Sequence, residues 1–175
     1  MAQICEGRIF AGKTKRSYGA AFRYLIVQIG SGMFLLAGAI LLMSETGNAE
    51  FRNFDINSLY GQLIFIAFGI KAAFPLLNGW LQDAYPEASE IGTVALSVFT
   101  TKLAIFCFAK SFAGTDILIL IGVIMTFFPM FFAIIENDLR RVLTYCLNSQ
   151  LGFMIVAIGI GTELAINGAV AHAIV

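Results

Sequence analysis

The sequence predicts an all-α protein built as a bundle of transmembrane helices, and three observations lead to this prediction. Hydrophobic residues make up 59% of the chain and charged residues only 13%, which is about half the charged share of an ordinary soluble domain. The apolar residues fall into runs of about 20, the length of helix that crosses a bilayer core. Most charged residues lie between these runs. Such a chain cannot cover its surface with polar groups, so most of its exterior must face lipid.

Five stretches are long enough, or nearly so, to span the membrane. They are Tyr24–Met43, Leu59–Leu81, Ile91–Ala109, Ile117–Ile135 and Val142–Ile160. A sixth begins at Leu164 and reaches Val175 after twelve residues, which corresponds to ~18 Å of helix. We therefore expect a polytopic bundle of five complete spans plus a truncated sixth, as in a fragment of a longer protein. No linker divides the chain, so residues 1–175 are expected to form a single membrane domain.

Lysine and arginine residues predict the orientation, because cytoplasmic segments of membrane proteins are enriched in them. Those before the first span are Arg8, Lys13, Lys15, Arg16 and Arg23. Arg140 and Arg141 follow the fourth span, which places them on the same side after an even number of crossings. The opposite side has only Arg52 and Lys110. We therefore expect a cytoplasmic N-terminus.

The charge balance, the cysteines and the single histidine argue against nucleic-acid binding, a disulfide framework and a metal or haem site. Lys and Arg total 11, as do Asp and Glu, so there is no basic excess to bind nucleic acid. Cys5, Cys107 and Cys146 are far apart, so we interpret them as packing residues and not as a disulfide framework or a metal site. His172 is the only histidine, whereas haem-carrying bundles usually need paired ligands. We expect no metal and no cofactor.

Lys71 lies deep in the second apolar stretch. It is twelve residues past Leu59 and ten before Leu81, which places it ~15 Å or more from either end of a helix. A lysine side chain reaches only about 6 Å, so the ammonium cannot extend to an interface. Its insertion costs ~2.5–3.5 kcal/mol, which indicates a hydrated interior or a counter-charge beside it. The alternative is a neutral or locally solvated lysine that only affects packing.

Pro75 predicts that the same span is broken. Proline has no N–H to bind the carbonyl of Lys71, and its ring pushes that carbonyl aside. Freed backbone groups at this depth are tolerated only where protein or water satisfies them, so we expect a polar pocket near Pro75. The alternative is an ordinary proline kink, which is how we interpret Pro129 in the fourth span.

Two further residues could take part in proton transfer. Lys102 is eleven residues past Ile91 and seven before Ala109, about 10 Å from the nearer end of its helix. Consecutive antiparallel spans bring Lys71 and Lys102 to similar depths, and repulsion between two ammonium groups favours proton exchange near neutral pH. His172, in the sixth stretch, suits a proton carrier because imidazole titrates near neutrality; a packing role is the alternative.

No carboxylate lies in the middle of any predicted span. A buried lysine that exchanges protons normally needs a counter-ion. Glu136 is at a helix end, and the segment from Gln82 to Glu90, which contains Asp83 and Glu87, is predicted to be a connection. We expect the partner of Lys71 in a missing segment or in another subunit.

Three runs of this sequence resemble, in order, those of a known family. GIKAAFPLLNGWLQDAYPEA followed by TTKLAIFCFAK is similar to the signature of the proton-conducting antiporter-like membrane subunits. That family includes the N-, M- and L-type subunits of respiratory complex I and the D-type subunits of multi-subunit sodium/proton antiporters. ENDLRRVLTYCLNSQLGFM and AINGAVAHAIV resemble two later stretches of the same family. The resemblance covers Tyr18 to Val175.

The resemblance implies roles for individual residues. Lys71 matches the lysine of a broken helix, which pairs with a glutamate on an earlier helix. Lys102 matches a bridging lysine on the following helix, and His172 matches the first histidine of a later helix. Trp80 and Asp83 match the turn that follows the break. The implied function is translocation of protons, or of cations in exchange for protons, along Lys71, Lys102 and His172.

The sequence also departs from the family pattern. Asn78 stands where the family usually has histidine, WLQDA replaces W-L-P-D-A, and SEIGTVALS replaces A-P-T-P-V-S-A. These changes suggest a divergent branch of the family. Two complexes remain as alternatives for the one that contains the subunit: an NADH-quinone oxidoreductase and a multi-subunit cation/proton antiporter.

The same resemblance implies the setting. The expected partners are the lipid bilayer, other membrane subunits of a respiratory or antiporter complex, and protons, with sodium as an alternative. The expected location is the bacterial inner (plasma) membrane, and the subunit would have no catalytic site of its own. The glutamate helix would precede Met1 and a further lysine helix would follow Val175. A truncated or split-gene remnant without independent transport activity is the rival hypothesis.

Overall fold

The computed structural model describes residues 15–48 and 50–174, and the regular structure in these ranges is entirely helical. In chain order the elements are α2 (Lys15–Thr46), α3 (Leu59–Lys71), α4 (Gly79–Glu87), α5 (Glu90–Ala95), the π-helical η1 (Leu96–Thr100), α6 (Thr101–Ser111), α7 (Asp116–Ile135), α8 (Leu139–Ile160) and α9 (Glu163–Ile174). The predicted all-α class is confirmed.

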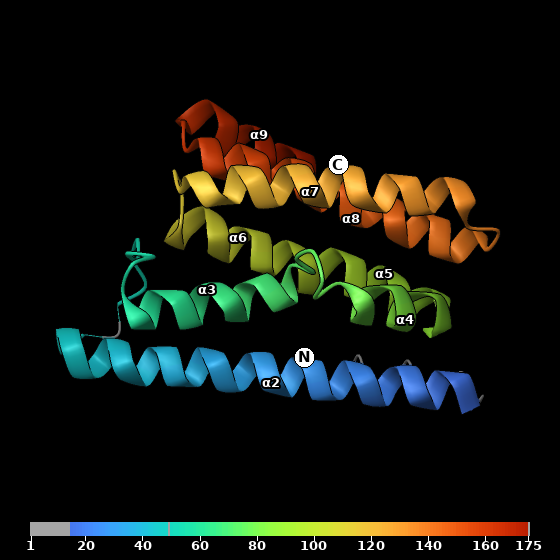
Figure 1. Cartoon of the computed structure of the whole chain (residues 1–175), viewed down its shortest axis with the longest axis horizontal. Coiled ribbons are helices and arrows are strands. Elements are labelled where there is room, and N and C mark those ends of the chain that lie inside the picture. The colour runs from blue at the N-terminus through green and yellow to red at the C-terminus, as the bar shows by residue number, and fades with distance from the viewer. Residues whose placement is uncertain (1–14, 49, 175) are drawn as a thin grey trace.

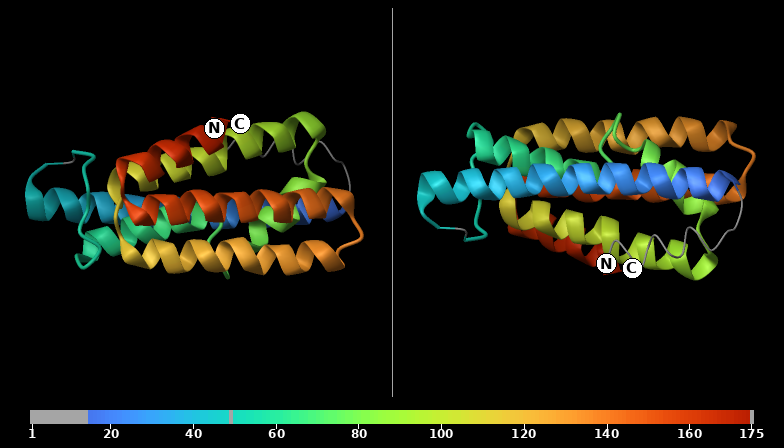
Figure 2. Two further views of the ribbon diagram at one scale, coloured as in Figure 1. Left: turned by 90° about the horizontal axis from the view of Figure 1, so that it is seen from above. Right: turned by 90° about the horizontal axis from the view of Figure 1, so that it is seen from below.

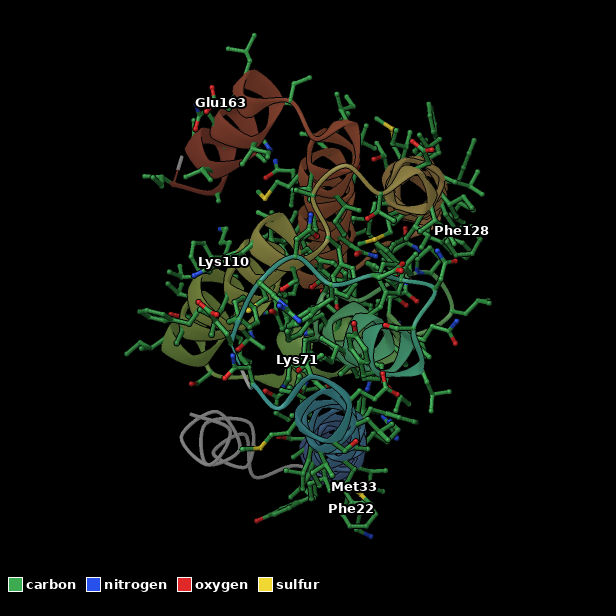
Figure 3. The ribbon with its side chains drawn as sticks, turned by 90° about the vertical axis from the view of Figure 1, so that its left-hand side faces the viewer. Phe22, Met33, Lys71, Lys110, Phe128 and Glu163 are labelled. Atoms are coloured by element: carbon green, nitrogen blue, oxygen red, sulfur yellow. The ribbon has the colours of Figure 1, made fainter. Side chains whose placement is uncertain are left out.

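Four of these helical segments are long and apolar enough to cross a membrane: α2, the continuous α5–η1–α6 segment, α7 and α8. Helix α3 is also apolar but has only 13 residues. Large apolar side chains point away from the bundle, among them Phe22, Met33 and Phe128 in Figure 3. Because an apolar exterior of this kind is stable only in lipid, the chain is an integral membrane protein. The predicted second span is divided between α3 and α4, and α9 has 12 residues.

The helices lie side by side along the long axis of the molecule (Figure 1). Helix α2 packs on α3 and α4, and α7 and α8 form an antiparallel pair. Seen from above and below, α7 and the α5–α6 segment lie on opposite sides of α8 (Figure 2). Helix α9 folds back along α8 and also contacts α6.

One end of the bundle carries a set of ion pairs. It brings together the start of α2, the α4–α5 junction and the α7–α8 connection, at the right of Figure 1. The pairs are Arg16–Glu87 at 3.1 Å, Arg23–Asp83 at 2.8 Å, Arg140–Glu90 at 3.7 Å and Arg141–Glu136 at 3.6 Å. The basic residues before the first span and after the fourth therefore lie at one end, as the sequence predicted; Arg8 and Lys13 are outside the described residues.

The predicted connection over Gln82–Glu90 is wrong, because α4 continues to Glu87 and only Ala88 and Ser89 separate it from α5. The reason is electrostatic. Asp83 and Glu87 are one helical turn apart on α4, and they face Arg23 and Arg16, which are two turns apart on α2. Charged residues that pair with a neighbouring helix do not need to end the helix that carries them.

Close packing of α7 against α8 depends on glycine. A Cβ atom at Gly122 would lie 2.8 Å from the backbone nitrogen of Val156 and 2.9 Å from the carbonyl oxygen of Gly152. At Gly152 it would lie 2.7 Å from the backbone nitrogen of Thr126. In lipid there is little hydrophobic drive to join helices, so small residues that let backbones approach are a main source of attraction.

We expect Gly122→Ala to destabilise the chain by ~1–3 kcal/mol, because the added methyl group forces α7 away from α8. The measurement is an unfolding titration of the purified protein with sodium dodecyl sulfate, followed by circular dichroism. Gly30→Ala is the matched control, since a Cβ atom there meets nothing within 4 Å. Equal stability of the two variants would contradict this account of the α7–α8 contact.

Candidate functional site

The interruption between α3 and α4 is the central feature of the site. Helix α3 ends at Lys71, and a series of turns leads to the start of α4 at Gly79. Pro75 lies within this interruption, where the sequence predicted a break. On either side of it, Ala73 and Leu76 adopt positive φ angles of 59° and 70°. Such angles cost about 1–3 kcal/mol each in residues other than glycine, so the surrounding contacts must enforce this backbone path.

Trp80 holds the two halves of the broken span together. Its indole Nε1–H donates a hydrogen bond of 2.9 Å to the carbonyl of Ile70, and the ring is 3% exposed. The backbone N–H of Ala73 donates to the same carbonyl at 3.3 Å. The sequence predicted a freed carbonyl at Lys71; the carbonyl to which Trp80 donates belongs to Ile70, one residue earlier. The first turn of α4 thus supplies a donor to backbone at the end of α3.

An aromatic cluster packs against the interruption. Phe74 stacks on Phe108 of α6, with centroids 5.2 Å apart and planes at 17°, and meets Phe65 of α3 at 5.6 Å. Gly69 makes room for this ring, because a Cβ atom there would lie 2.7 Å from Phe74 Cδ2. The cluster anchors the turn to α3 and α6, and it keeps the backbone beside Lys71 in a defined position.

Lys71 is the last residue of α3 and lies inside the bundle, between α2, α3 and α6 (Figure 3). Its Nζ donates a hydrogen bond of 3.0 Å to Oε1 of Gln28 on α2. A cation at the C-terminal end of a helix also interacts favourably with the last carbonyl groups. Cys107 of α6 lies within electrostatic range of the ammonium. The lysine is half-buried and is held by a neutral amide.

Sequence reasoning missed Gln28. It lies in the middle of the first apolar stretch and is 7% exposed. A glutamine at that depth is a signal in itself, because an amide in lipid needs a partner. Which helix supplies the partner cannot be read from spacing, since Gln28 and Lys71 are 43 positions apart.

Lys102 lies at a different helix interface from Lys71. It follows the π-helical η1 and lines a cavity of about 100 Å³ with Ile158 of α8 and with Ala169 and Ala173 of α9. In the part of the chain that the structure describes, no hydrogen bond joins the two lysines. Lys102 is half-buried and faces α9. This is the helix that contains His172, the residue that the sequence predicted to follow Lys102 in the path.

His172 is on α9 but is exposed and does not line the cavity of Lys102. Ala169 and Ala173 occupy the face of α9 that does. The structure therefore brings Lys102 to α9 and leaves the imidazole on a neighbouring face of that helix. Asp83 is not at the depth of Lys71: it accepts a hydrogen bond of 2.8 Å from Arg23 Nε at the charged end of the bundle.

A second polar feature lies in the interior. Asn148 of α8 is 1% exposed, and neither its Oδ1 nor its Nδ2 has a hydrogen-bond partner among the described residues. The neighbouring Ser149 donates to the carbonyl of Thr126 on α7 at 3.0 Å. An unsatisfied buried amide of this kind is a place where water is expected. Within residues 15–48 and 50–174, no group of three or more histidine, cysteine or carboxylate side chains could hold a metal ion.

The chain belongs to the family described as "NADH:quinone oxidoreductase/Mrp antiporter, TM", whose sequence model matches residues 8–175. It is 30% identical to NADH-quinone oxidoreductase subunit M of Escherichia coli K12, over 91% of this chain and 35% of that protein. It is 28% identical to the D subunit of the Na(+)/H(+) antiporter of Alkalihalophilus pseudofirmus, over 93% of this chain and 37% of that protein. The chain thus spans about a third of the length of the curated relatives it matches.

Two solved structures share the fold of this chain. A chain of the membrane-bound sulfane sulfur reductase, an archaeal respiratory membrane complex, superposes with a TM-score of 0.85 at 25% identity, over 98% of this chain and 39% of that chain. A chain of the Mrp complex from Dietzia sp. superposes with a TM-score of 0.83 at 22% identity, over 91% of this chain and 33% of that chain. The second likeness shows the fold.

We expect Trp80→Phe to lower the free energy of unfolding by ~1–3 kcal/mol, because it removes the indole donor and leaves a buried carbonyl with one partner fewer. The measurement is the detergent unfolding titration together with amide hydrogen exchange in the segment between α3 and α4. Exchange should accelerate there and stay unchanged in α7. Wild-type exchange in the interruption would show that Trp80 does not hold the break.

Proposed function

We propose that this chain is part of a subunit that moves protons, or cations in exchange for protons, across the membrane. The observation that carries the proposal is the position of Lys71: a charged residue at the end of an interrupted helix, inside the bundle, with a neutral amide as partner. An ionisable residue at that depth is costly, and in membrane proteins such residues are typical of ion and proton pathways. The name of one relative, the D subunit of a Na(+)/H(+) antiporter, points the same way.

Lys71 would store a proton and release it. The ammonium ends α3 next to turns that contain two strained residues, so a small change in those turns can move the charge relative to α2 and α6. Lys102 would pass the proton laterally, because its cavity opens toward α9. His172 would continue the path, after a rotation of α9 or through water. Water near Asn148 would hydrate the interior beside α8.

The rest of the setting follows from the family. We infer that α3 and α4 together form one broken span and that α9 is the beginning of a sixth. The charged end of the bundle would face the cytoplasm of a bacterial cell, in the inner membrane. Other membrane subunits of a respiratory or antiporter complex would cover part of the apolar exterior, since the relatives are named as subunits. Protons are the proposed cargo and sodium is the alternative.

We expect Lys71→Ala, placed in the full-length protein that contains this chain, to abolish proton transport and to leave membrane insertion intact. Loss of the ammonium at this break removes the group that holds the proton. The measurement is proton uptake by reconstituted vesicles that contain a pH-sensitive dye. Comparing sodium buffer with choline buffer shows whether transport of protons depends on sodium. Lys110→Ala is the matched control, because Lys110 lies at the end of α6, over the ring of Phe51. Normal transport by Lys71→Ala would refute the proposal.

Orientation has its own test. In a background with the native cysteines replaced by alanine, Asn137→Cys reports on the charged end of the bundle and Asn53→Cys on the opposite end; both positions are exposed. A membrane-impermeant maleimide added to intact cells should label Asn53→Cys alone, and should label both after the membranes are opened. The reverse pattern would place the N-terminus outside the cytoplasm.

A further inference from the structure

We infer that Gln28 is a positioning residue for Lys71, whose amide oxygen holds the ammonium in place without neutralising it. This inference rests on the proposed function of Lys71. It assigns part of the proton site to α2, a helix in which sequence reasoning found no candidate.

The contact joins two helices at a defined point. Gln28 Oε1 accepts from Lys71 Nζ at 3.0 Å. An ammonium only donates, so the oxygen of the amide must face the lysine and the Nε2 group must point away from it. Gln28 lies on the buried face of α2 with Tyr24 and Ser31, at helical spacing of four and three residues, and this helix packs on α3. The amide is therefore on the face of α2 that is turned toward the bundle, where the lysine binds it.

The chemistry of an amide suits a group that must release its proton. A carboxylate at this place would add a second negative charge to the counter-ion that is expected from a missing segment or another subunit. That extra attraction would hold the lysine in its charged form still more strongly. A neutral amide offers only a dipole, so it lowers the cost of the buried charge and still lets the proton leave. The amide is neither an acid nor a base near neutral pH. Gln28 therefore positions the carrier and does not carry the proton.

The Nε2 group of Gln28, which points away from the lysine, supports the inference. Gln28 Nε2 is buried and has no hydrogen-bond partner among the described residues, and the same is true of Ser31 Oγ, one turn further along α2. Buried polar atoms are rarely left without a partner, so an acceptor such as water is expected at this point. Gln28 Nε2 and Ser31 Oγ are two unsatisfied groups on one face of α2, and they indicate that water enters beside the amide that holds Lys71.

The test compares two substitutions in the full-length protein, reconstituted with its complex in vesicles. Gln28→Leu removes the acceptor and should lower the initial rate of proton transport about tenfold, the effect of losing one hydrogen bond to a charged group. Gln28→Glu keeps the length of the side chain and adds a carboxylate. It should leave resistance to unfolding by sodium dodecyl sulfate equal to wild type or higher, and still lower transport about tenfold or more.

That combination separates positioning from packing, because a residue needed only for packing would tolerate Gln28→Glu in a well-folded protein. Gln62→Leu is the matched control, since Gln62 is exposed on the same helix as Lys71 and should leave transport unchanged. Wild-type transport by folded Gln28→Glu, or by Gln28→Leu, overturns the inference. Lys71→Ala is measured in parallel: if it transports normally the proposed function itself fails, whereas if it blocks transport while the Gln28 variants are active, only the role of Gln28 is lost.

Discussion

The cost of placing an ammonium group inside an apolar bundle constrains the rest of this structure. Lys71 must be at the end of α3, where carbonyl groups face it, and it must meet an acceptor on another helix, which is Gln28. The break that ends α3 would expose carbonyl groups of its own, and Trp80 returns from α4 to bind one of them. Each of these contacts is needed because lipid offers backbone and charge no alternative partner.

The molecule is closely packed in two places, beside the interruption and between α7 and α8. Aromatic rings from α3, α6 and the turn itself pack into one cluster, and α7 and α8 approach so closely that glycine is required at the contact. At one end, α2 and α4 are joined by Arg16–Glu87 and Arg23–Asp83. These pairs are partly exposed and each contributes little to stability.

Under the proposed function, the arrangement separates the two lysines of the pathway. Lys71 lies at the interface of α2 and α3, and Lys102 lies at the interface of α6, α8 and α9. With the lysines at separate interfaces, the proposed transfer between them would require water or a movement of the turns beside Lys71.

Sequence alone determined the all-helical membrane fold and the break at Pro75, because hydrophobic run length and the missing N–H of proline are local properties. It was wrong about Gln82–Glu90, where pairing with α2 keeps charged residues helical. Only the tertiary structure decided that Gln28 meets Lys71, that Trp80 binds the Ile70 carbonyl and that His172 lies off the face of α9 that meets Lys102. These relations depend on how helices far apart in the chain rotate and pack, which spacing along one helix does not specify.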